Sequence, residues 1–133
     1  MSTTHERLPI ATSSDVVLVR NAVRTAAERM GLRNIDVTKL VTAASEIARN
    51  TLVYGGGGTA EVECLQAERR TGVRVRFEDH GPGIADVQLA LREGYTTGGG
   101  LGLGLSGSKK LVDDFEIDSE VARGTRVTMT KWR

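Results

Sequence analysis

The chain has 133 residues, a length that suits one compact domain with its own core, so we expect a single domain over residues 1–133. Its 18 basic and 17 acidic side chains nearly cancel, so no net charge attracts nucleic acid or an anionic membrane, and a partner must be recognised locally. One Trp, two Tyr and two Phe are too few for a base-stacking platform, and a lone cysteine, Cys64, forms no internal disulfide. With no apolar run near the roughly 18 residues of a membrane span, the composition favours a cytoplasmic protein that binds neither nucleic acid nor membrane.

Two amphipathic helices are predicted in the first half. Residues 1–7 lack the layout of a secretory signal and are expected to form a short frayed tail, followed by a short strand over residues 8–12. A helix over residues 16–30 is capped by the side-chain oxygens of residues 13–15, and a second helix runs from a cap at Asp36 to Val53. The first has one apolar face with a three- and four-residue period and an opposite face that carries Arg20, Arg24 and Arg29.

The second half alternates strands and helices. Residues 59–68 and 72–79 form a predicted hairpin, in which Cys64 is a small core-facing residue, and residues 115–121 and 125–132 form a closing antiparallel pair. A short helix over residues 86–93 and a third main helix over residues 103–112 lie between the two pairs. This order predicts an α/β two-layer sandwich, with a mixed, mainly antiparallel sheet covered on one face by three main helices.

The second predicted helix carries a first candidate site, Glu46 and Asn50. Residues four apart on a helix project from the same side, so the carboxylate and the carboxamide point together. Such a pair suits a Mg²⁺ ligand beside a group that orients a nucleophile, because Mg²⁺ prefers oxygen ligands. A solvated polar face is the more common origin of this pattern.

A second candidate follows the predicted strand 72–79. Asp79 stands at its end, with Gly81, Gly83 and Ile84 in the turn. A carboxylate there can accept a hydrogen bond from an exocyclic amine, while glycines let a flat ligand approach the backbone; an ordinary turn is the alternative. We expect His80 to face solvent.

The third candidate is a glycine-rich stretch over residues 96–107 that leads into the third main helix. Successive backbone N–H groups in such a loop can bind an anion, and glycine permits the turns that wrap a polyphosphate. Neither the P-loop nor the dinucleotide-binding pattern is present, and simple flexibility is the alternative.

The order of the three candidates is more specific than any one of them: Asn50 precedes Asp79 by one hairpin, and Asp79 precedes the glycine-rich stretch by one short helix. In this arrangement the chain resembles, over essentially its whole length, the GHKL ATPases, whose Bergerat nucleotide-binding fold is marked by an N box, a G1 box and a G2 box. The resemblance implies ATP and Mg²⁺ as ligands and a lid over residues 94–100. It assigns catalysis to Glu46, the metal to Asn50, and nucleotide binding to Asn50, Asp79, Gly81, Gly83, Ile84, Thr97, Gly98, Gly99, Gly100, Leu101, Gly102, Leu103, Gly104 and Thr125.

Within that family the chain looks most like the serine/threonine switch kinases of bacterial stress-response complexes. That likeness implies a STAS-domain protein as the phosphorylated substrate and a downstream phosphatase regulator that the released kinase binds and activates. Two alternatives stay open: an anti-sigma factor kinase that binds a sigma factor directly, and an ATP-gated binding module without phosphoryl transfer. The sequence leaves the oligomeric state undetermined.

Overall fold

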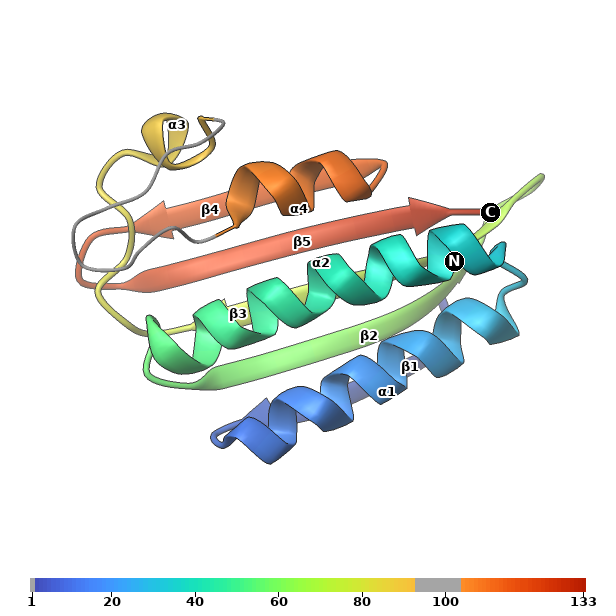
Figure 1. The fold of residues 1–133 in the computed structure, drawn as a ribbon, viewed down its shortest axis with the longest axis horizontal. Coiled ribbons are helices and arrows are strands. Elements are labelled where there is room, and N and C mark those ends of the chain that lie inside the picture. Colours follow the sequence, from blue (N-terminus) through green and yellow to red (C-terminus); the bar gives the residue numbers. More distant parts are fainter. Residues whose placement is uncertain (1, 93–103) are drawn as a thin grey trace.

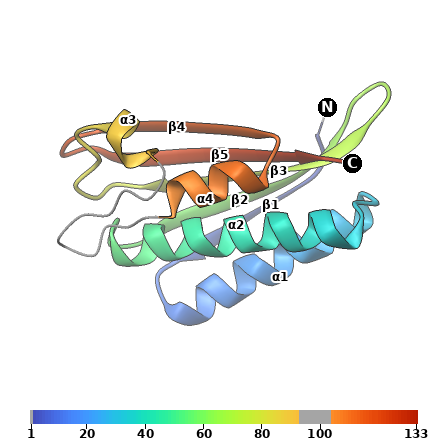
Figure 2. The same cartoon turned by 45° about the horizontal axis from the view of Figure 1, so that its top comes forward.

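The fold is a five-stranded sheet with helices on one face. The computed structural model describes residues 2–92 and 104–133, and the sheet order is β1-β2-β3-β5-β4 with all four neighbouring pairs antiparallel. Helices α1, α2 and α4 lie on the same face (Figures 1 and 2), which confirms the predicted two-layer α/β sandwich. The elements are β1 (Ser2–Ile10), α1 (Ser13–Arg29), α2 (Asn34–Val53), β2 (Gly58–Gln66), β3 (Thr71–Asp79), α3 (Val87–Ala90), α4 (Leu105–Leu111), β4 (Asp114–Glu120) and β5 (Gly124–Trp132).

The frayed tail predicted for residues 1–7 is wrong, because β1 begins at Ser2 and pairs with β2 along its length. The side chains of residues 4–7 are all exposed, so no alternation of apolar and polar residues marks this part of the strand in the sequence. This strand is held in place by its backbone pairing with β2 and by a 2.7 Å contact between His5 Nε2 and Glu61 Oε2 across the two strands.

Both long helices begin earlier than predicted. Thr12 caps α1 and forms a capping box with Asp15, whose carboxylate accepts from the Thr12 N–H. Helix α2 begins at Asn34, and the residue at its N-cap, Arg33, makes no side-chain capping bond. The predicted cap, Asp36, lies inside the first turn of α2. There its negative charge interacts favourably with the positive end of the helix dipole, and the side chain is buried beside cationic groups.

The core lies between α2 and the centre of the sheet. Leu40 and Ile47 of α2 are fully buried against the strands that carry Phe77 and Met129, and Cys64 is buried at the edge of this core as predicted. Burial of such side chains is worth about 1.5–3 kcal/mol each, which fixes α2 on the sheet. No helix in the described ranges has the length and apolarity needed to cross a membrane.

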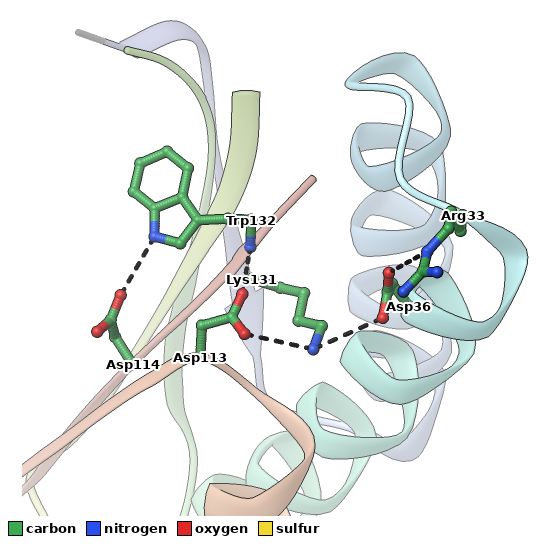
Figure 3. Close-up of polar contacts among 6 residues, drawn as sticks. All are labelled: Arg33, Asp36, Asp113, Asp114, Lys131 and Trp132. Carbon is green, nitrogen blue, oxygen red and sulfur yellow. Dashed lines mark hydrogen bonds and ion pairs between the residues drawn. The ribbon is translucent and has the colours of Figure 1, made fainter. Parts of the chain in front are cut away.

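An ionic cluster joins the start of α2 to the last two strands (Figure 3). Lys131 Nζ lies 3.6 Å from Asp36 Oδ1 and 3.5 Å from Asp113 Oδ1, and Arg33 Nε donates to Asp36 Oδ2 at 3.1 Å. Burial alone would raise the pKa of Asp36, but Arg33 and Lys131 outweigh it and hold that pKa below its ordinary value. The backbone N–H of Trp132 also donates to Asp113 Oδ2 at 2.7 Å. The cluster therefore fixes one end of the helix whose other half carries Glu46 and Asn50.

We expect Lys131→Ala to lower the free energy of unfolding by about 2–4 kcal/mol, because it removes one partner of a buried pair. The Lys131 side chain is only 12% exposed, whereas that of Arg33 is 80% exposed. Arg33→Ala should therefore cost under about 1 kcal/mol. Urea denaturation of both variants measures the difference, and equal losses would show that Lys131 is not the main partner of Asp36.

Candidate functional site

A narrow pocket lies between α2 and the central strands β3 and β5. Its inner wall is apolar, with Phe77 and Val127 from the sheet and Leu105 from α4, and polar groups stand around this wall. The structure brings four of the predicted site residues together here, from four separate segments of the chain: Asn50, Asp79, Ile84 and Thr125. An apolar slot with a few convergent polar groups suits a flat heterocycle.

Asp79 is the buried carboxylate of this pocket. Its Oδ1 accepts hydrogen bonds from the backbone N–H groups of Gly81 at 2.9 Å and Thr125 at 3.3 Å. Burial raises the pKa of Asp79 above its ordinary value, although both backbone donors act in the opposite direction. Among the described residues no hydrogen-bond donor to Oδ2 is present, so this oxygen can accept from the amine of a bound base.

Glycine is required where neighbouring turns close around Asp79. A Cβ at Gly55 would collide with the Asp79 carboxyl group, and a Cβ at Gly124 would collide with the Asp79 carbonyl oxygen. Gly124 also has a φ of 119°, which L side chains rarely adopt. The glycine run that ends α2 is thus part of the packing around the carboxylate.

Two residues that sequence reasoning missed hold these turns in place. Tyr54 Oη donates to the carbonyl of Gly83 at 2.8 Å, and Ser119 Oγ accepts from the Ile84 N–H at 2.8 Å. Ser119 Oγ also lies 2.8 Å from Thr125 Oγ1. A signal for Ser119 exists in the sequence, because it is a hydroxyl residue at the inward position of a strand that otherwise places Phe115 and Ile117 there.

Glu46 lies outside the wall of this pocket, one helical turn before Asn50 on α2. Its side chain is half-buried and packs on Gly104, the residue that precedes α4. A Cβ at Gly104 would lie 2.5 Å from Glu46 Cγ, so glycine is needed for this approach. Glu46 and Gly104, which belongs to the predicted glycine-rich stretch, are therefore neighbours.

The other predicted glycines fall in two groups. Gly81 and Gly83 lie in the turn beside Asp79, where His80 is exposed as predicted. The remaining predicted nucleotide-binding residues lie outside the described residues: Thr97, Gly98, Gly99, Gly100, Leu101, Gly102 and Leu103.

The donor groups present fit a magnesium ion held mainly by a nucleotide. Asn50 supplies one carboxamide at the pocket, and the described part of the chain holds no cluster of three His, Cys, Asp or Glu side chains. Mg²⁺ commonly keeps several waters and takes its remaining ligands from substrate phosphates, so one protein oxygen is sufficient.

Comparison with known proteins places this geometry in a family. Residues 35–133 match the family model described as histidine kinase-, DNA gyrase B- and HSP90-like ATPase, and the chain belongs to that ATPase family. The match begins at α2 and includes every element that lines the pocket. ATP is thus the nucleotide implied for the site.

Within the family, the chain is 37% identical over 123 residues to the serine/threonine-protein kinase RsbT of Bacillus subtilis, covering 92% of each chain. It is 27% identical over 129 residues to the anti-sigma F factor of Clostridium novyi, covering 92% of this chain and 89% of that protein. The predicted resemblance to switch kinases and, beside them, anti-sigma factor kinases is confirmed, and with it an ATP-using enzyme related to protein serine/threonine kinases.

Solved structures support the fold. The RsbU and RsbW domains of a Mycobacterium tuberculosis protein superpose with a TM-score of 0.65 at 21% identity, covering 98% of this chain and 33% of that one. The catalytic domain of histidine kinase ThkA gives a TM-score of 0.54 at 16% identity, covering 95% of both chains. At these identities the similarity concerns architecture alone.

We expect Asp79→Asn to weaken ATP binding by about 10- to 150-fold, the equivalent of one charge-assisted hydrogen bond of roughly 1.5–3 kcal/mol. The fold should persist, because the carboxamide oxygen can still accept from Gly81 and Thr125. Titration with a fluorescent ATP analogue measures the loss, and Asp118→Asn on exposed β4 serves as the control.

The pH dependence separates this role from simple packing. Protonation turns Asp79 from a charged acceptor into a neutral group with an O–H donor, so wild-type affinity should fall as the pH drops through its raised pKa. The titration of the nucleotide phosphates is common to both proteins, so the extra loss in wild type relative to Asp79→Asn isolates this carboxylate. If the pH profiles of wild type and Asp79→Asn were parallel, Asp79 would not be the residue that recognises adenine.

Proposed function

We propose that residues 1–133 form one ATP-binding kinase domain that phosphorylates a serine or threonine of a partner protein in a bacterial partner-switching pathway. The observation that carries this proposal is the placement of Glu46 and Asn50 one turn apart on α2, beside the pocket that holds Asp79. One helix thus presents the carboxylate proposed as the general base and the carboxamide proposed as the metal ligand next to the slot proposed for adenine. The 37% identity to a serine/threonine-protein kinase supports the same activity.

Each site residue has a distinct part in the proposed reaction. Asp79 accepts from the adenine amine, and Gly81, Gly83, Ile84 and Thr125 surround the base and its neighbouring groups. The glycine-rich residues from Thr97 to Gly104 bind the phosphates through their backbone. Asn50 would hold Mg²⁺, and the ion would supply positive charge beside the phosphate oxygens.

Glu46 acts as the general base. It takes the proton of the partner's hydroxyl as the hydroxyl oxygen forms a bond to the γ-phosphorus, and the bond from that phosphorus to the bridging oxygen of ADP breaks. The products are a phosphorylated side chain and ADP. In such a transfer, catalysis depends mainly on positioning and on charge stabilisation.

The proposed substrate is a STAS-domain antagonist, and the proposed second partner is a phosphatase regulator that the kinase binds and activates once released. A cytoplasmic location fits this role and the single cysteine of the chain. A second candidate, an anti-sigma factor kinase that binds a sigma factor directly, is favoured by the 27% identity to anti-sigma F factors. Mixing with a panel of sigma factors in the presence of ATP distinguishes the two.

Nucleotide binding should depend on Mg²⁺, and Asn50→Ala should weaken it because the proposed protein ligand to the metal is lost. Isothermal titration with ATP in magnesium and in EDTA measures both effects. Wild-type affinity should fall on chelation, and the variant should lose most of the difference between the two conditions. Binding of equal strength with and without metal would contradict the assignment.

Glu46→Gln should keep ATP affinity within a few-fold while phosphoryl transfer falls by about 10²–10⁴, the usual contribution of a general base. Glutamine retains the shape of the side chain and removes its basicity. Single-turnover transfer of labelled phosphate to a panel of STAS-domain proteins tests this, with Glu28→Gln on the exposed side of α1 as the control.

Two results would contradict the proposal in different ways. Wild-type transfer by Glu46→Gln would show that another group is the base. ATP-dependent binding of a STAS-domain protein by the wild-type chain, without transfer to any member of the panel, would replace the kinase by an ATP-gated binding module.

A further inference from the structure

A groove of about 370 Å³ runs between α1 and α2 on the outer side of the helical layer. Its floor is formed by Val16 and Val41, and it reaches Glu46 on α2. Figures 1 and 2 show the two helices side by side on the same face of the sheet. The groove shares no lining residue with the pocket around Asp79, and Glu46 of the groove lies one helical turn before Asn50 of the pocket.

Three arginines line this groove. Arg20 and Arg24 are one turn apart on α1, and Arg49 faces them from α2. All three are exposed, and within residues 2–92 and 104–133 none of them makes an ion pair or a side-chain hydrogen bond. Three guanidinium groups around one hollow create a local positive potential in a chain whose net charge is only +1.

The open face of the sheet provides a contrast. There the charges are already paired across strands: Arg74 donates to Glu63 at 3.1 and 3.2 Å, and Arg126 donates to Glu78 at 2.7 and 3.1 Å. A partner that docked on that face would have to displace these pairs. The groove between α1 and α2 offers three arginines that form no ion pair in the described ranges, and Glu46 is the one acidic residue of its lining.

We propose that this groove docks an acidic segment of the protein substrate and so presents the substrate's hydroxyl to Glu46. The groove residues on α2 extend from Thr38 to Arg49, a distance of about 16 Å at 1.5 Å per residue, which matches about five residues of extended chain. Carboxylates of such a segment pair with the guanidinium groups in two-point geometry. The near-neutral chain thus recognises its partner by a local charge pattern. The proposal rests on the kinase function above.

The test is charge reversal on α1. Arg20→Glu and Arg24→Glu change exposed positions, where substitutions usually alter stability by less than about 0.5 kcal/mol. Arg29→Glu is the matched control, because it lies on the same helix but lines a different hollow, toward β1. Arg49 is left unchanged because it adjoins Asn50.

The probe is the member of the STAS-domain panel that binds wild type most tightly in the presence of ATP. We expect Arg20→Glu and Arg24→Glu to weaken that complex at least about tenfold, and Arg29→Glu to change it less than about threefold. Affinity for the fluorescent ATP analogue should be the same in all four proteins. Wild-type affinity should fall as salt is raised, since the attraction is between exposed charges.

The outcomes separate the groove from the kinase function. Unchanged partner affinity in Arg20→Glu and Arg24→Glu overturns the proposed docking role of the groove, even if the partner is phosphorylated. If Arg20→Glu and Arg24→Glu lose partner binding while Arg29→Glu keeps it, and wild type transfers no phosphate, the docking role of the groove is supported and the kinase activity is overturned. A change in sedimentation of the free chain on charge reversal, with partner affinity intact, would assign the groove to a second copy of the chain. Absence of binding to every panel member by wild type overturns both proposals.

Discussion

The turns around the nucleotide pocket are arranged about one buried carboxylate. Asp79 stands at the end of β3, and an ionised carboxylate that is largely removed from water requires hydrogen-bond donors. The structure supplies two backbone N–H groups to its Oδ1, one from Gly81 and one from Thr125. A Cβ at Gly55 would collide with this carboxylate, and a Cβ at Gly124 would collide with the Asp79 carbonyl oxygen, so the close packing around Asp79 requires glycine at both positions. The glycine content of this end of the molecule follows from that constraint.

Helix α2 connects the pocket to the rest of the fold. Its buried face fixes its position on the sheet, and Lys131 holds its first turn through Asp36 at the end far from the pocket. Glu46 and Asn50 lie on the half that adjoins Gly104 and the pocket, respectively. Because a helix is stiff over this length, anchoring at the first turn and along the core defines where both side chains stand.

The sequence predicted the parts of the structure that depend on local pattern. The three- and four-residue apolar period located α1 and α2. The order of Asn50 and Asp79, and the family resemblance for Thr125, singled out residues that the structure brings to one pocket. The start of α2 was misplaced because Asp36 serves a tertiary ion pair with Lys131, which no local signal shows. The first part of β1, residues 2–7, was missed for a similar reason, since it is ordered by pairing with β2.

The supporting residues Tyr54 and Ser119 show another limit of sequence reasoning. Each holds a turn through a contact with a backbone atom: Tyr54 bonds the Gly83 carbonyl, and Ser119 accepts from the Ile84 N–H. A bond of this kind depends on where two distant segments meet, and the partner's side chain plays no part in it. The amino-acid types at positions 83 and 84 therefore do not indicate which side chain supports each turn. The motif residues were found because their chemistry is needed at the ligand, and their supports were missed because they act on the backbone.

The raised pKa of Asp79 has a further consequence for the free protein. A carboxyl group whose folded-state pKa is raised is less favourably ionised in the folded than in the unfolded chain, so at neutral pH it lowers stability, and the cost is relieved as the pH falls through the raised pKa. A bound amine that donates a hydrogen bond to Oδ2 stabilises the ionised carboxylate, so it reduces this loss of stability without protonation of Asp79. Nucleotide binding and folding are thus linked through one group, since the feature that destabilises the empty pocket also makes an amine donor favourable there. Under the proposed role of Asp79, the same glycine-lined enclosure that excludes water from this carboxylate also favours a base that carries an amine.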